Sequence, residues 1–397
     1  MISTTVYTEE IDDMQVAAEE LYSQLKDFTV RKNTLGIIFC DIETNENELV
    51  KELHNYYDFP IIGATAVALL TNNEGYRNIG ITLMIMTSNS CEFLTDETAE
   101  LTAENAEQEI AATYKRLKAK LTQPEKLALV YAPQMSFLTG DYIVKYYNKV
   151  NPEGLIFGGI ASDNFELTSN RIFFNESSSQ KKVILVLIGG NLKPVFQQQY
   201  SIIDTKGIMS TVTKSQDNIV YEVTEGKFLD VLKNKGMDIN DANADAYLKF
   251  VCSVFEANID VGNNEYISVM RDLRSINFEE GSAIFLGNVP VGSKMRLCVL
   301  NKENINSTVR RAFIDVLAQI KQNSDYHYTT FLCTSCAGRF LNLATEPDFE
   351  GKVCQELTPP GLSLCGMYSY GEICPTKAPS GRCYNIFHNK TFTLVAF

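Results

Sequence analysis

Short apolar strands alternate with amphipathic helices along most of the chain. Apolar side chains recur at helical spacing, with acidic residues in the first turns, in segments 11–28, 96–122 and 302–323. Runs rich in Val, Ile, Leu, Phe and Thr predict strands at 79–87, 182–189, 194–203, 265–271, 282–286, 293–300 and 391–397. This alternation is typical of α/β proteins.

One arrangement of segments occurs three times. The three pairs are "LGIIFCD" (35–41) with "FPIIGATA" (59–66), "LALVYAP" (127–133) with "GLIFGGIASD" (154–163), and "TTFLCTSCAGR" (329–339) with "GLSLCGMYSYGEI" (361–373). In each pair a buried strand, a crossover and a second strand end in a glycine-containing loop, which predicts a βαβ unit with parallel strands. Loops that follow parallel neighbours lie at the same carboxyl edge of the sheet, where ligands of α/β proteins bind. We therefore expect the loop with Arg339 to lie beside the loop with Glu372.

The predicted fold class is α/β (mixed α+β) with two domains, near 1–205 and 206–397. Each domain is expected to contain a mixed β-sheet with helices on its outer faces. The stretch 204–245 carries few apolar residues, and we expect the chain to pass between the halves there. No low-complexity linker marks this boundary, which predicts halves that pack closely.

The charge of the chain excludes several classes of partner. Its 397 residues are 45% hydrophobic and 21% charged, with a net charge of −14, so the chain can form a core and repels polyanions. The densest basic stretch, "YKRLKAK" at 114–120, fits a solvated helix face. We expect no nucleic-acid partner and no anionic membrane surface.

The N-terminus has no basic and apolar regions of a signal peptide, and no apolar run approaches the length of a membrane span. The expected location is therefore cytoplasmic. In that compartment most of the ten cysteines should be reduced and buried. Cys40, Cys91, Cys252 and Cys298 fit that role because each lies in an apolar run.

The remaining six cysteines lie near the C-terminus, and Cys333 and Cys336 form a Cys-x-x-Cys motif. A structural zinc site would need two further ligands at similar spacing, and the later cysteines are scattered singly. A redox pair is disfavoured because Cys333 continues the buried pattern of its strand. Nucleophilic catalysis by Cys336 lacks a base, because His327 lies at the other end of the strand and His388 in a predicted hairpin turn. No metal and no cofactor are expected, and Cys336 is predicted to be the most reactive thiol.

Recognition of a small molecule fits the third unit better. Arg339 can hold a carboxylate in bidentate fashion, and Glu372 can hold an ammonium group. Tyr368 and Tyr370 offer stacking and hydroxyl contacts. Opposite charges on adjoining loops suit a zwitterion such as an amino acid. The alternative, which the residues leave open, is that Arg339 and Glu372 pair with each other.

The second unit contributes further candidates. Gly158 and Gly159 could let the backbone approach a ligand closely, although they lack the spacing of a dinucleotide-binding loop. Asp163, four residues beyond Gly159, could supply a carboxylate to a ligand or hold its own turn.

Four motifs in order resemble the FIST family (F-box and intracellular signal transduction). The end of the family's N-terminal domain resembles "GLIFGGIASDNF" and the following "RIFFNESSSQKKVILVLIGG". The middle of its C-terminal domain resembles "EEGSAIFLGNVPVGSKMRLCV". "CAGR" (Cys336, Gly338, Arg339) and "GMYSYGEICP" (Tyr370, Glu372) are similar to the closing motifs of that domain.

This resemblance implies a cytosolic module that senses small molecules such as amino acids. The family often carries a fused signalling or F-box segment, and none is left over here, so output is expected through a separate signalling protein. "IGATAVAL" at 62–69 lacks the Gly-Glu often found in the family's equivalent loop, so no ligand contact is expected from that region. The predicted function is a ligand sensor without enzymatic activity. The alternatives are a Cys336-dependent enzyme acting on a small carboxylated substrate and a scaffold that binds only protein.

Overall fold

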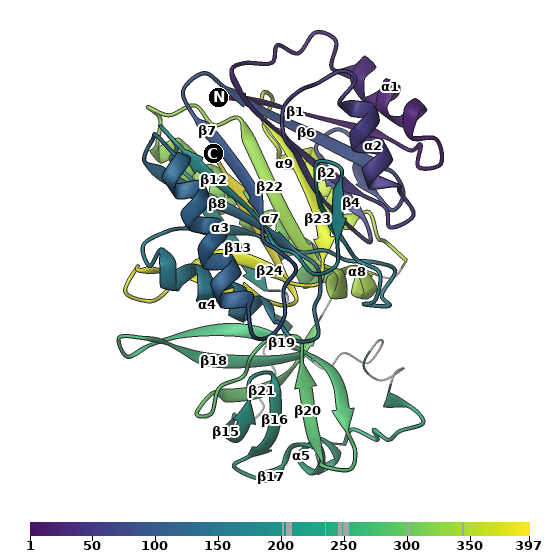
Figure 1. Ribbon diagram of the computed structural model, residues 1–397. Coiled ribbons are helices and arrows are strands. Elements are labelled where there is room, and N and C mark those ends of the chain that lie inside the picture. The colour runs from purple at the N-terminus through teal and green to yellow at the C-terminus, as the bar shows by residue number, and fades with distance from the viewer. Residues whose placement is uncertain are drawn as a thin grey trace.

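The computed structural model describes residues 1–200, 202–203, 209–234, 236–244, 248, 254–300, 302–343 and 345–397. Most of these residues form three units with the same order of elements (Figure 1). Each unit runs from an edge strand through a helix, a strand, a helical crossover and a parallel strand to a hairpin and a last strand. Cys252, expected to be buried, lies outside the described residues.

Unit 1 comprises residues 2–88. Its elements are β1 (Ile2–Thr8), α1 (Met14–Gln24), β2 (Asn33–Cys40), α2 (Glu46–Leu53), β3 (Ile61–Thr65), β4 (Leu69–Thr71), β5 (Gly75–Arg77) and β6 (Ile81–Ser88). The helix starts follow from local chemistry, because the side chain of Asp13 accepts the N–H groups of Gln15 and Val16, and Asn45 accepts that of Glu48.

Unit 2 comprises residues 92–189. Its elements are β7 (Glu92–Glu97), α3 (Ala106–Lys120), β8 (Glu125–Ala132), α4 (Gly140–Val150), β9 (Ile156–Ile160), β10 (Ile172–Phe174), β11 (Ser177–Ser179) and β12 (Ile184–Gly189). The helix predicted at 96–122 begins only at Ala106, because residues 92–97 form an edge strand that pairs with β12.

Unit 3 is discontinuous in sequence. Its elements are β13 (Val195–Tyr200), α7 (Lys302–Gln322), β22 (Thr330–Cys336), α8 (Ala337–Leu343), α9 (Phe349–Leu357), β23 (Ser363–Ser369), β24 (Glu372–Lys377), β25 (Cys383–His388) and β26 (Thr391–Ala396). The segment between β13 and α7 forms a separate antiparallel body.

The three units exchange their hairpins. The sheet orders are β1-β6-β2-β3-β10-β11, β7-β12-β8-β9-β24-β25 and β13-β26-β22-β23-β4-β5. In every sheet the two central strands are parallel, and the outer hairpin comes from another unit. The parallel pairing of β22 with β23 places Cys336 opposite Ser369. The three predicted βαβ units are thus confirmed.

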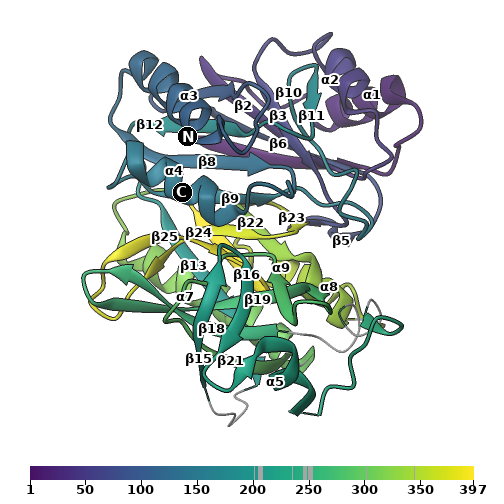
Figure 2. The same cartoon turned by 60° about the horizontal axis from the view of Figure 1, so that its bottom comes forward.

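The inner faces of the three sheets share one core, which contains Phe39, Tyr131, Phe157, Met367 and Val395. Helices cover the outer faces: α1 and α2 on the first sheet, α3 and α4 on the second, α7 and α9 on the third (Figure 2). Central strands such as β8 and β12 are therefore buried on both faces. This explains why they are continuous apolar runs and do not alternate.

The inserted segment forms a small barrel below the three units in both views (Figures 1 and 2). Its elements are β14 (Ile202–Ile203), β15 (Ser210–Gln216), β16 (Ile219–Val223), β17 (Gly226–Lys227), α5 (Phe228–Asn234), β18 (Val254–Gly262), β19 (Glu265–Asn277), β20 (Ser282–Phe285) and β21 (Lys294–Leu300). Six of the strands pair in the ring β21-β15-β16-β20-β19-β18, which returns to β21.

The predicted class, mixed α/β with helices on outer faces, is confirmed. The boundary at 205/206 stays a prediction. Strands from both sides of it share two sheets, since β24 pairs with β9, and β23 with β4.

Candidate functional site

The loops at the carboxyl ends of β3, β9 and β23 meet at one place, and Ser162 joins all three. Its N–H donates to the carbonyl of Thr65 at 2.9 Å, and its hydroxyl donates to the carbonyl of Tyr368 at 2.6 Å. The same hydroxyl accepts the N–H of Val67 at 2.9 Å. The carboxyl ends of these three strands therefore meet at one place, and the parallel pairing of β22 with β23 brings the two loops of the third unit to the same edge, with Cys336 opposite Ser369.

Gly158 and Gly159 lie in β9, directly beside the start of β24. Gly159 pairs with Glu372, and Gly158 with Ile373. A Cβ atom on Gly158 would lie 1.8 Å from the carbonyl oxygen of Val130, so only glycine permits this close approach of two strands. The structure thus brings the glycine pair next to Glu372.

Asp163 holds its own loop together. Its buried carboxylate accepts backbone N–H groups from Glu166, Leu167, Thr168, Ser169 and Asn170. The Tyr370 hydroxyl also donates to it. Burial alone would raise the pKa of Asp163, but the Tyr370 hydroxyl and these N–H groups hold it well below its ordinary value. Of the two roles considered for Asp163, the turn-holding role has clear structural support.

Arg339 pairs with Glu350, so neither the expected joint site of Arg339 and Glu372 nor the alternative, in which these two pair with each other, describes this arginine. Its Nε and a terminal nitrogen donate to Oε1 of Glu350 at 2.9 and 2.7 Å, and both side chains are fully buried. Arg339 lies in α8 and also contacts the carbonyl of Ile305 in α7, so it faces the helices that cover the sheet. Parallel pairing brings the two loops together, but it does not determine which way a helical side chain points.

Tyr368 lies beside this ion pair. Its ring is fully buried and packs edge-on against Phe340 and Tyr76. Burial, and after it the Glu350 carboxylate, raises the pKa of Tyr368 well above its ordinary value. Within the described part of the chain, the Tyr368 hydroxyl and Oε2 of Glu350 lack hydrogen bonds of good geometry. Tyr368 therefore offers no exposed ring face on which a ligand could stack.

Glu372 is a fully buried carboxyl group, and no cationic side chain pairs with it in the part of the chain that the structure describes. Ser369 donates to its Oε1 at 2.9 Å, and the Thr391 hydroxyl and N–H donate to its Oε2 at 2.5 and 3.3 Å. Over the residues that the structure describes, Glu372 forms no ion pair. Burial raises the pKa of Glu372 to about 8, against the opposing effect of the Thr391 and Ser369 hydrogen bonds. The charge of Arg339, which pairs with Glu350, also acts to lower the pKa of Glu372.

Cys336 lies next to Glu372 and is buried, with 2% of its surface exposed. Burial, and after it the Glu372 carboxylate, raises the pKa of the Cys336 thiol far above its ordinary value. Burial also raises the pKa of the Cys333 thiol. The exposed free cysteine among those described is Cys383. The expectation that Cys336 is the most reactive thiol is therefore wrong.

Lys390 covers this region from the corner between β25 and β26. Its ammonium group lies 3.1 Å from Asp272 of the barrel. A Cβ atom on Gly338 would lie 2.2 Å from Nζ of Lys390, so the glycine makes room for that side chain. Strands β25 and β26 belong to different sheets. The hairpin turn predicted around His388 is therefore a corner that joins two sheets.

The barrel covers the carboxyl end of units 2 and 3 through buried polar contacts. Arg271 in β19 is fully buried and donates to Asp141 of α4 at 2.9 Å and to the carbonyl of Phe387 at 3.1 Å. Burial, and after it Arg271, lowers the pKa of His388 to about 3, so this imidazole is neutral. Together with Lys390 and Asp272, these contacts enclose Cys336 and Glu372 between the barrel and the sheets.

Several of these residues were absent from the sequence prediction. They are Ser369, Thr391, Lys390, Asp272, Arg271 and Glu350. An Arg inside the strand pattern at 265–271 was the one available signal, because an isolated charge in a buried strand needs a partner. The others lie in ordinary polar turns or helices, where nothing local marks them.

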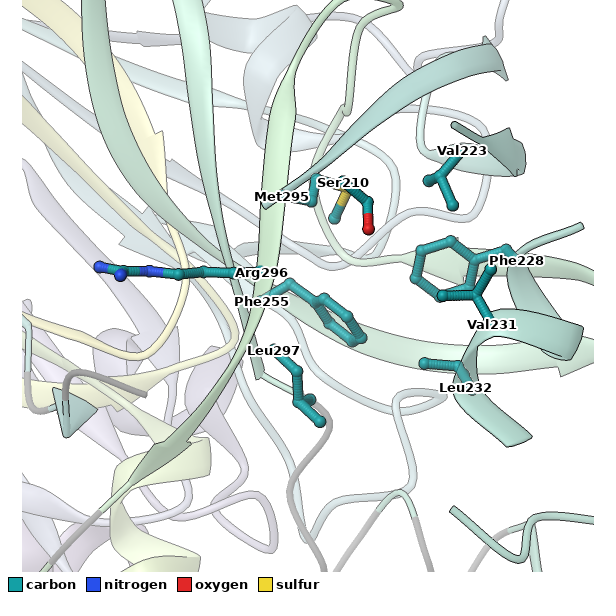
Figure 3. A pocket seen from close by; sticks show the side chains of 9 residues that line it. All are labelled: Ser210, Val223, Phe228, Val231, Leu232, Phe255, Met295, Arg296 and Leu297. Carbon is teal, nitrogen blue, oxygen red and sulfur yellow. The ribbon is translucent and has the colours of Figure 1, made fainter. Parts of the chain in front are cut away.

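A second enclosed region lies inside the barrel (Figure 3). Its lining residues are Ser210, Val223, Phe228, Val231, Leu232, Phe255, Met295, Arg296 and Leu297, and its volume is about 20 Å³. The Arg296 side chain points away from the aromatic rings and pairs with Glu256 (Figure 3). This space holds about one water molecule, so it is too small for a metabolite.

The described residues contain neither a metal-binding cluster nor a membrane-spanning helix. No group of three or more His, Cys, Asp or Glu side chains there could hold a metal ion. No helix in that part of the chain is both long and apolar enough to span a membrane.

Comparison with known families decides the affiliation. The family model of the FIST N domain matches residues 34–225, and that of the FIST C domain matches residues 229–375. The chain belongs to the FIST family. FIST domains are sensory domains of signal transduction.

Among solved structures, this FIST protein resembles a chorismatase with 7% identity and a TM-score of 0.33, over 99% of this chain and 97% of the other. It also resembles the cyanuric acid hydrolase from A. caulinodans with 9% identity and a TM-score of 0.26, and the match covers 50% of this chain and 70% of that hydrolase. A further cyanuric acid hydrolase matches with 10% identity and a TM-score of 0.28, and the match covers 67% of this chain and 84% of that hydrolase. Likenesses this weak carry no functional weight. The sequence matches no curated protein at a significant level.

Proposed function

We propose that this FIST protein is a cytoplasmic sensor of a small amine-bearing metabolite, such as an amino acid, which binds at Glu372. Its output would pass through a separate signalling protein. The observation that carries the proposal is a fully buried carboxyl group that has no cationic partner among the described residues, at the point where the carboxyl-end loops meet. Ligand sites of α/β proteins occur at this edge.

A ligand ammonium group would complete the electrostatics of this site. A buried carboxylate is costly in free energy unless it is paired and hydrogen-bonded. Ser369 and Thr391 already supply hydrogen bonds to Glu372, so the missing component is a positive charge. Gly159 and Gly158 pair with Glu372 and Ile373 across the neighbouring strands, and Cys336 lies opposite Ser369, which donates to Glu372.

Recognition of a ligand carboxylate has weaker support. Arg339 was the residue predicted for that task, and Glu350 already neutralises it. The proposal therefore rests on the amine, and an amino acid is one member of a wider class. A nucleophilic role for Cys336 is disfavoured by its burial and its raised pKa.

Proton release on binding gives a specific test. Because the pKa of Glu372 is raised to about 8, the free site is mostly protonated at pH 7. An ammonium group favours the ionised carboxylate, so binding should release about one proton per site. Isothermal titration calorimetry at pH 7 in buffers of different ionisation enthalpy measures this number. A thermal-shift screen with amino acids and simple amines selects the ligands for it.

Variants distinguish this site from any other. Glu372→Gln keeps the shape and removes the charge, and it should weaken amine binding at least about a hundredfold, since breaking a buried pair costs roughly 3–5 kcal/mol. Glu279→Gln, an exposed residue of the barrel, is the matched control and should bind normally. Retained binding in Glu372→Gln would overturn the assignment. If no amine shifts the melting curve and a protein partner co-purifies, the scaffold alternative replaces the sensor.

A further inference from the structure

An open cleft lies at the amino end of β3, away from the Glu372 site. It lies between the α2–β3 loop, residues 54–60, and the tip of the β10–β11 hairpin. Its volume is about 360 Å³, within the range of small-molecule sites. The lining residues are His54, Tyr57, Asp58, Phe59, Pro60, Phe174 and Asn175. β3 runs from Ile61 to Thr65, so its two ends are roughly 15 Å apart.

Three aromatic rings form much of this lining. The ring centroids of Tyr57 and Phe59 are 4.9 Å apart, and Tyr22 packs edge-on against Tyr57 at 5.9 Å. Phe59 is 6% exposed, and burial raises the pKa of Tyr57 to about 12. Phe174 closes the cleft from the hairpin. Packing by neighbouring rings holds Tyr57 and Phe59 in place before any ligand arrives, which lowers the entropy cost of binding.

The charges at the cleft are acidic. Asp58 is exposed, and over the described residues it forms no ion pair. Glu176, on the hairpin tip, lies 3.8 Å from Nδ1 of His54. No Lys or Arg is among the lining residues. Rings with negative faces, together with two carboxylates at the rim, attract a positive charge.

The hairpin position is defined by hydrogen bonds across two units. The Ile61 N–H donates to Oδ1 of Asn175 at 3.0 Å, and the Asn175 N–H donates to the carbonyl of Ile61 at 2.8 Å. The hairpin follows β9 of unit 2 in sequence, but it pairs with β3 of unit 1. A molecule in this cleft would contact two units at once.

We propose that this cleft binds a small organic cation of the alkylated ammonium class. Cation–π attraction to the rings and the charge of Asp58 and Glu176 provide the affinity. The partly exposed rings of Tyr57 and Phe174 favour a compact, weakly hydrated cation, because its desolvation costs less than that of a metal ion or a primary ammonium group. This site is separate from Glu372, so it adds a second input to the sensor.

Choline and its uncharged isostere 3,3-dimethylbutan-1-ol are the probes. The two differ only by nitrogen in place of carbon, so any difference in affinity comes from charge. In ¹H–¹³C NMR titrations of aromatic-labelled full-length protein, choline should shift the signals of Tyr57, Phe59 and Phe174. The isostere should bind at least about fivefold more weakly, on the scale of one cation–π contact.

Four variants complete the test. Asp58→Asn and Glu176→Gln should each weaken choline binding by about two- to fivefold, as expected for loss of one exposed charge. Asp12→Asn, an exposed acid elsewhere on unit 1, is the control and should change nothing. Glu372→Gln should keep choline binding, which separates this site from the one proposed above. Equal affinity for the isostere, unchanged binding in both acidic variants, or shifts that map outside the cleft would overturn the proposal.

Discussion

Replacing Glu372 by Gln should change how stability depends on pH. In the folded protein, burial raises the pKa of Glu372 to about 8 from an ordinary value of 4.5. Below pH 4.5 the carboxyl group is protonated in both the folded and the unfolded state, so it causes no penalty. Between pH 4.5 and 8 the unfolded chain loses this proton while the folded protein keeps it. Stability therefore falls as the pH rises through this window.

The magnitude follows from the width of the window. Each pKa unit corresponds to about 1.36 kcal/mol, so a shift of about 3.5 units costs about 5 kcal/mol above pH 8. Between pH 5.5 and 8.0 the change is about 3 kcal/mol. Gln does not titrate, and its amide can accept from Thr391 and donate to Ser369, whose hydroxyl can rotate. The variant should therefore gain about 3 kcal/mol relative to the native protein between these two pH values.

Urea denaturation of both proteins at pH 5.5 and 8.0 measures this difference. All other groups titrate in both proteins, so their contributions cancel in the comparison. Glu279→Gln, which removes an exposed carboxyl group, should follow the native profile. A difference between Glu372→Gln and the native protein that stays constant with pH would show that Glu372 is ionised in the fold. The buried, protonated carboxyl group would then be refuted.

Three further outcomes are expected. Arg339→Ala should lower the free energy of unfolding by about 3–5 kcal/mol, because it leaves a buried carboxylate unpaired; a loss below about 1 kcal/mol would indicate an exposed pair. Limited iodoacetamide labelling, mapped by mass spectrometry, should modify the exposed Cys383 first and Cys336 only on unfolding; early labelling of Cys336 would contradict its burial. Gly158→Ala should cost several kcal/mol in denaturation experiments, because its Cβ would lie 1.8 Å from the carbonyl oxygen of Val130; a stable variant would show that the two strands can separate.

The sequence was informative wherever a local pattern decides the structure. Continuous apolar runs, crossovers and glycine loops predicted three parallel strand pairs, and all three exist. Parallel pairing then implied that the loops after β22 and β23 lie at one edge, and the register places Cys336 opposite Ser369 there. The four short motifs were sufficient to indicate the family.

The side-chain partners could not be predicted in the same way. Arg339 was expected beside Glu372, but it points to the helical layer, where Glu350 lies 11 residues further along the chain. Cys336 was expected to be the most reactive thiol, but it is buried, close enough to Lys390 and the barrel residue Asp272 to feel their charges. Both errors concern which elements pack over a loop, and the residues of the loop do not contain that information.

By itself, the sequence determined the repeated strand–crossover–strand pattern and the edge at which a site would form, because backbone preference and burial are encoded by nearby residues. Only the tertiary structure decided that each hairpin joins another unit's sheet, that a barrel inserted after β13 covers the Glu372 site, and that Glu372 has no cationic partner among the described residues. These outcomes depend on contacts between segments up to several hundred residues apart. Such contacts are selected by the packing of whole faces against one another, which no short window of the chain specifies.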